Sequence, residues 1–127
     1  MNYLKQEAEK RENTKEEIMQ LVKLIHSVLD DRQAEEIKVI DISGISVLAD
    51  YFIIAHGKNI SHIDALVGHV DQKCAEKGIQ PKHVEKSADN GWVLMDYSNV
   101  IVHIFSEQDR KFYELERLWA DGKIVEL

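Results

Sequence analysis

The segment Tyr51-Phe52-Ile53-Ile54-Ala55 is a short, continuously apolar run that ends at Gly57. A run of this length without polar alternation is typical of a β-strand that is covered on both faces. An amphipathic helical pattern follows between Ser61 and Gly78, and residues 82–85 form a further short strand pattern. We therefore expect a right-handed strand–helix–strand crossover, in which the two strands run parallel. Gly78 stands where a left-handed residue is expected to end the helix.

Three segments carry the signals of capped, amphipathic helices. Each begins with two side chains, three residues apart, that can satisfy unpaired amides of the first helical turn. The cap pairs are Thr14 with Glu17, Ser61 with Asp64, and Ser106 with Asp109. The first apolar stripe predicts a helix over residues 15–31. The apolar side of the third helix is expected to consist of Phe112, Leu115, Leu118 and Trp119.

Two apolar runs, residues 92–97 and 100–105, are separated only by Ser98 and Asn99. This spacing predicts an antiparallel hairpin, with Asn99 able to adopt a positive φ. Residues 36–42 form a further strand pattern. Because one connection is a parallel crossover and another is a hairpin, the sequence predicts a mixed sheet.

The strand and helix patterns follow one another without a linker or an internal repeat. They predict one α/β domain over residues 14–127. Residues 1–13 precede it as an extension that is either a frayed helix or a disordered tail.

Charge and cysteine content exclude several classes of function. The 127 residues include 23 acidic and 16 basic side chains, which give a formal net charge of −7. This charge argues against a free-standing nucleic-acid binder and suits a basic protein partner. The single cysteine, Cys74, excludes an intramolecular disulfide and a multi-cysteine zinc site. Since there is no apolar run of roughly 18 residues and no signal-peptide pattern, we expect a cytoplasmic protein without a membrane segment.

The side chains that could carry chemistry form no recognised catalytic or metal-binding motif. His62 and His69 lie further apart than the usual helical metal pair, and no third ligand is placed beside them. His103 stands alone in an apolar strand and is interpreted as a structural group, tied to a carboxylate such as Asp96. The order of elements resembles nucleotidyltransferase domains, but this chain has Leu66 where those enzymes place a second carboxylate. We therefore expect no metal, no cofactor and no catalysis.

Four blocks of the sequence occur in a characteristic order: Leu48–Ala55, Gly91–Tyr97, Val100–Phe105 and Arg110–Trp119. Together they closely resemble the ribosomal silencing factor family, also called Iojap-like proteins. The resemblance implies a nucleotidyltransferase-like α+β fold, with a mixed sheet of about five strands packed by helices and without catalytic activity. It also implies binding to a large-subunit ribosomal protein, number fourteen in the universal naming. A protein bound there sterically blocks joining of the two subunits and lowers translation when nutrients are scarce.

The residue pattern and the resemblance together indicate seven side chains as partner contacts. Aromatic side chains anchor protein interfaces, and carboxylates suit the Lys and Arg side chains of a ribosomal protein. The seven are Asp50, Tyr51, Trp92, Asp96, Tyr97, His103 and Arg110. Each of them also has a purely structural interpretation. In contrast, the side chains expected to hold the last helix to the sheet are Tyr113, Glu116 and Trp119.

Two alternative functions remain open at this point. The first is an enzyme that retains nucleotidyl transfer through an unusual acid pair, and the second is a generic dimeric adaptor that does not bind ribosomes. The resemblance implies self-association as a homodimer, yet an apolar sheet face serves a ribosomal partner equally well. No direct sequence-specific binding of nucleic acid is expected.

Overall fold

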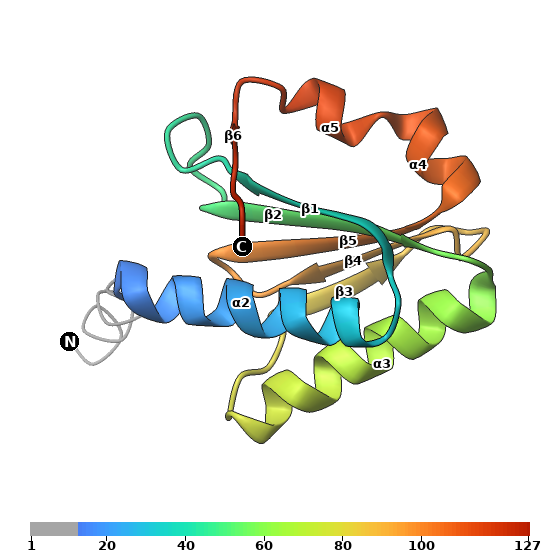
Figure 1. Ribbon diagram of the computed structural model, residues 1–127, viewed down its shortest axis with the longest axis horizontal. Coiled ribbons are helices and arrows are strands. Elements are labelled where there is room, and N and C mark those ends of the chain that lie inside the picture. The colour runs from blue at the N-terminus through green and yellow to red at the C-terminus, as the bar shows by residue number, and fades with distance from the viewer. Residues whose placement is uncertain (1–12) are drawn as a thin grey trace.

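A computed structural model describes residues 13–127 as helices on a six-stranded sheet (Figure 1). The helices are α2 (Lys15–Asp31), α3 (Ile60–Glu76), α4 (Glu107–Tyr113) and α5 (Leu115–Leu118). The strands are β1 (Glu35–Asp41), β2 (Tyr51–Gly57), β3 (His83–Lys86), β4 (Trp92–Asp96), β5 (Val100–Ser106) and β6 (Lys123–Ile124). The predicted extension at residues 1–13 lies outside the described residues, apart from Asn13. Within the described part of the chain, no helix is long and apolar enough to cross a membrane.

The strands form one mixed sheet in the order β3-β4-β5-β2-β1-β6. β2 and β5 pair in parallel, whereas the other neighbouring strands pair antiparallel. The mixed sheet and the hairpin of β4 and β5 are therefore confirmed. β3 runs in the direction of β2, as predicted, although β4 and β5 lie between them. The sequence pattern missed β6, because a two-residue strand is too short to show any periodicity.

Helices cover both faces of the sheet (Figure 1). α2 and α3 lie against one face, and α4 and α5 lie over the other. β2 is buried from Phe52 to Gly57, which confirms that its apolar run is a strand covered on both faces. The core under α2 and α3 includes Ile25, Leu29, Ile53, Leu66 and Val102. The smaller core under α4 and α5 includes Ile40, Ile42, Phe52, Ile54 and Phe105.

The helix ends follow the predicted caps in two cases. The Thr14 hydroxyl accepts a hydrogen bond from the Glu17 amide at 3.0 Å, and α2 has the predicted bounds. The Ser106 hydroxyl accepts from the Asp109 amide at 3.0 Å and caps α4 in the same way. Gly78 follows α3 with a φ of 76°, a conformation that suits glycine at a helix end.

Two local predictions were wrong. α3 is capped by Asn59 rather than Ser61, because the Asn59 side chain accepts from the amide three residues later at 2.8 Å. In the turn between β4 and β5, the positive φ of 74° belongs to Ser98 and not to Asn99. Asn99 instead donates through its side chain to Asp50 Oδ2 at 3.0 Å. This long-range contact is invisible to reasoning from the hairpin alone.

The predicted third helix is in fact two short helices. The backbone breaks between α4 and α5 at Glu114, whose φ of 47° is left-handed. The break changes the direction in which later side chains point. Leu118, after the break, is 76% exposed instead of lying on the apolar side. Phe112 lies on α4 before the break and is 77% exposed, so it is not on the packed side of that helix either. Leu115 and Trp119 do pack against the smaller core, as expected.

Candidate functional site

Alternate residues of β4 point to opposite faces of the sheet. Val93 and Met95 are fully buried under α2 and α3. Trp92, Leu94 and Asp96 are only partly buried on the other face, because α4 packs mainly on β2 and β5. Ile101 of β5 is paired with Asp96 and is also partly exposed. We refer to the four residues Trp92, Leu94, Asp96 and Ile101 as the open face.

Helix α4 extends the open face with two aromatic side chains. The ring centroid of Tyr113 lies 4.7 Å from that of Trp92, and the Phe112 ring lies 5.0 Å from Tyr113. The contact with Trp92 confirms that Tyr113 joins the last helical segment to the sheet. Both α4 rings are exposed, and exposed rings supported by other rings are typical anchors of protein interfaces.

A shallow hollow of about 190 Å³ lies beside the open face. It is lined by Trp92, Leu94 and the segment Glu85–Ser87. Glu85 is paired with Leu94, so its carboxylate belongs to the same face of the sheet as that of Asp96. The apolar centre is therefore flanked by two carboxylates, and Lys86 also lines the hollow. An apolar centre with a polar edge is the usual division between the core and the rim of an interface.

His103 lies beneath the open face and is 3% exposed. Its Nδ1 accepts a hydrogen bond from Trp92 Nε1 at 3.1 Å. Burial lowers the pKa of His103 to about 4, so the imidazole is neutral at physiological pH. The predicted tie to Asp96 was wrong, because Asp96 is paired with Ile101 and accepts a hydrogen bond from the Ser98 amide.

The structure thus brings together three of the seven predicted contacts, Trp92, Asp96 and His103. Tyr97 is 6% exposed on the opposite face of the sheet, and burial raises the pKa of its phenol. Asp50 and Tyr51 lie at the start of β2, where they line a hollow of about 160 Å³ beside the first residues of α2.

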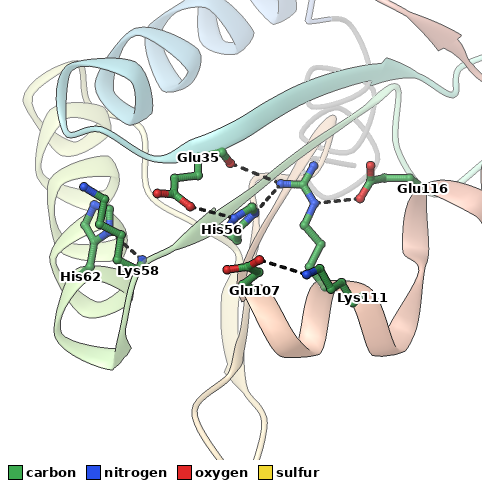
Figure 2. Close-up of polar contacts among 8 residues, drawn as sticks. Glu35, His56, Lys58, His62, Glu107, Lys111 and Glu116 are labelled. Carbon is green, nitrogen blue, oxygen red and sulfur yellow. Dashed lines mark hydrogen bonds and ion pairs between the residues drawn. The ribbon is translucent and has the colours of Figure 1, made fainter.

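Arg110, the seventh predicted contact, is 6% exposed and links α4 to three other elements. Its Nη1 donates to the Glu35 carbonyl oxygen of β1 at 3.3 Å and lies 3.0 Å from His56 Nδ1 of β2. Its Nε donates to Glu116 Oε1 at 2.8 Å. Figure 2 shows the Glu35 carboxylate meeting His56 from the other side, with 3.0 Å between Oε2 and Nε2. The buried Arg110 side chain therefore bonds to groups within the fold.

Glu116 connects Arg110 to strand β1, which agrees with its predicted role of holding the last helix to the sheet. Its second oxygen, Oε2, lies 3.0 Å from Lys38 Nζ of β1. Burial would raise the pKa of Glu116, but hydrogen bonds from Arg110 and Lys38 outweigh burial and lower it. The carboxylate is therefore ionised at neutral pH and pairs with two cations.

A polar cleft of about 440 Å³ opens next to Arg110. Its rim carries Lys111 and Glu107, whose charged atoms lie 3.0 Å apart (Figure 2). Three ion pairs line the cleft: Arg110 with Glu116, Lys111 with Glu107, and Arg117 with Glu114. Among residues 13–127, no group of three or more His, Cys, Asp or Glu side chains is placed to hold a metal ion.

The sequence predictions missed two residues of the open face, Leu94 and Ile101, and one of the two α4 aromatic side chains that extend it, Phe112. The alternation of β4 places Leu94 beside Trp92 and was a usable signal for it. Ile101 becomes visible only once the pairing of β4 with β5 is known. Phe112 was assigned to the packed side of the third helix, but it lies 77% exposed on α4.

Fold and site together define a small α+β domain that leaves an aromatic, acid-flanked part of its mixed sheet open. The chain belongs to the ribosomal silencing factor family: the family model RsfS, "Ribosomal silencing factor during starvation", matches residues 15–127. This match confirms the resemblance carried by the four sequence blocks.

Individual relatives agree with the family match. The ribosomal silencing factor RsfS of Bacillus subtilis is 37% identical over 107 residues, which cover 84% of this chain and 91% of that protein. A crystal structure from Chromobacterium violaceum has a TM-score of 0.78 at 30% identity, covering 81% of this chain and 86% of that one. A more distant relative is the mitochondrial assembly of ribosomal large subunit protein 1 of Mus musculus. It is 29% identical over 104 residues, which cover 78% of this chain and 45% of that protein.

Proposed function

We propose that this chain binds the large ribosomal subunit through ribosomal protein fourteen and blocks its joining to the small subunit. Translation is thereby repressed when nutrients are limiting, in the cytoplasm. Membership of the silencing factor family supports a ribosomal target. The mouse relative, which is named for assembly of the large ribosomal subunit, supports the choice of subunit.

The observation that carries a binding role is the open face. Burying exposed apolar surface is the main driving force of protein association, and aromatic side chains supply most of it at interface centres. Trp92 and Tyr113 offer such a centre, since their rings are already packed against each other. Glu85 and Asp96 place negative charge at its edge, and the whole chain carries a net charge of −7. This sign favours a basic ribosomal protein over RNA.

Under this proposal, the chain acts by steric exclusion and not by catalysis. The buried polar side chains closest to the cleft already serve the fold, because His56 and Arg110 bind each other and their carboxylate neighbours. A titration with nucleoside triphosphates tests the alternative enzyme. Saturable binding to residues of the cleft would support a nucleotidyltransferase instead.

Sucrose-gradient co-sedimentation with separated ribosomal subunits tests the proposal. The chain is expected to travel with the large subunit and not with the small one. Its association should weaken as salt rises, because the attraction between acidic and basic surfaces is screened. Failure to co-sediment with either subunit would reject the proposal and favour the dimeric adaptor. Binding that salt does not weaken would reject its electrostatic part.

A further inference from the structure

The open face contains a hydrogen bond that orients its central aromatic side chain. The indole Nε1 of Trp92 donates to His103 Nδ1 at 3.1 Å. Because the imidazole of His103 is buried, the polar edge of the Trp92 indole points into the protein. The apolar part of the Trp92 ring is then left for contact with another molecule.

We propose that His103 is a positioning residue, which holds the Trp92 indole in the orientation that the ribosomal partner recognises. The inference rests on the proposed function for its partner. It differs from the sequence prediction, in which His103 itself was a partner contact. With 3% of its surface exposed, His103 has no free surface for such a contact and acts through Trp92.

The imidazole is itself fixed by aromatic neighbours. Its ring centroid lies 4.8 Å from Phe52 in an edge-on arrangement with 78° between the planes. It is nearly parallel to Phe105, at 6.2 Å and 11°. A ring held by neighbours on two strands keeps its acceptor nitrogen at one place. The bond to Trp92 is thus preorganised, which lowers the ordering cost when a partner binds.

The other imidazole nitrogen shows that packing alone does not explain a histidine here. Since Nδ1 accepts from the indole, the neutral ring carries its proton on Nε2. Nε2 is buried and has no hydrogen-bond partner among residues 13–127. An unpaired buried donor lowers stability, and an apolar side chain of similar size would avoid that cost. The bond to Trp92 is the feature that an apolar side chain could not replace.

Two substitutions separate the acceptor from the bulk of the ring. His103→Leu removes the acceptor, whereas His103→Asn keeps an oxygen close to the position of Nδ1. In a proton–nitrogen NMR spectrum, we expect His103→Leu to shift the Trp92 indole resonance and to leave that of Trp119 in place. We expect large-subunit binding to weaken about tenfold in His103→Leu and to recover largely in His103→Asn.

A double-mutant cycle tests whether the effect passes through Trp92. In a Trp92→Ala background, His103→Leu should cause no further loss of binding. An equal loss in both backgrounds, or an unchanged indole resonance, would overturn the inference. Failure of the wild type to bind large subunits would instead reject the proposed function. It would also reject the large subunit as the partner that contacts the Trp92 indole.

The wild-type chain offers a test that needs no substitution. Protonation of Nδ1 removes the acceptor, and the pKa of His103 is about 4. The Trp92 indole resonance should therefore move as the pH falls from 5 toward 4, with the backbone amide signals showing that the fold persists. No movement of the indole signal while His103 titrates would contradict the proposed bond.

Discussion

Replacing Arg110 with alanine is expected to lower the free energy of unfolding by about 3 kcal/mol. The guanidinium is almost fully buried, and its removal takes a donor from His56 Nδ1, from the Glu35 carbonyl and from Glu116 Oε1, while Glu116 keeps Lys38 at Oε2. Buried polar groups that lose their partner keep the full cost of their desolvation. The loss should appear in urea denaturation as a lower midpoint with an unchanged slope.

The pH dependence of this loss follows from Glu116. Arg110 and Lys38 hold the pKa of Glu116 below its ordinary value near 4.5, despite its burial. The ion pairs therefore stabilise the fold above that pH, and their contribution falls as the carboxylate becomes protonated. The difference between wild type and Arg110→Ala should be largest at neutral pH and smaller in acid.

A neighbouring cation provides the matched control. Lys111 follows Arg110 in the same helix, but its side chain is 77% exposed and pairs with Glu107 at the surface. Lys111→Ala should change the free energy of unfolding by less than about 0.5 kcal/mol. Equal effects of the two substitutions would contradict the internal role that we assign to Arg110.

Replacing Trp92 with alanine is expected to weaken binding to the large subunit about thirtyfold, which corresponds to about 2 kcal/mol. Its indole lies where the open face meets the aromatic side chains of α4, and it contacts Tyr113, Phe105 and His103. Truncation removes the anchor and also the support of the Tyr113 ring. Affinity can be measured by fluorescence anisotropy with a labelled chain and purified large subunits.

The control for Trp92→Ala is an exposed apolar side chain elsewhere. Ile60, at the start of α3, is 42% exposed and lies outside the open face, so Ile60→Ala should bind normally. Thermal unfolding and circular dichroism show whether each variant is folded. A folded Trp92→Ala chain with wild-type affinity would exclude the open face as the binding surface.

The sequence allowed most of the fold to be predicted because its signals are local. The Thr14 cap, the apolar stripe of α2 and the spacing of the β4–β5 hairpin each depend on a few adjacent residues. The break at Glu114 was not predictable in this way, because no glycine or proline marks it. β6 depends on pairing with β1, far away in the sequence.

The candidate site was predictable only in part, because the sequence pattern does not show which face of the sheet stays uncovered. Alternation shows that Trp92 and Tyr97 point to opposite faces of a strand, but it does not show which face the helices leave open. That choice depends on α4 packing mainly over β2 and β5. The sequence predicted Arg110 as a partner contact because Glu35, which it bonds on β1, is 75 residues away in the chain.

A subunit-joining assay tests the central claim most directly. Separated small and large subunits are mixed, and light scattering follows the formation of whole ribosomes as the chain is added. We predict that joining falls in proportion to the occupancy of the large subunit, and that Trp92→Ala requires a correspondingly higher concentration. Full joining while the wild-type chain stays bound to the large subunit would contradict steric exclusion.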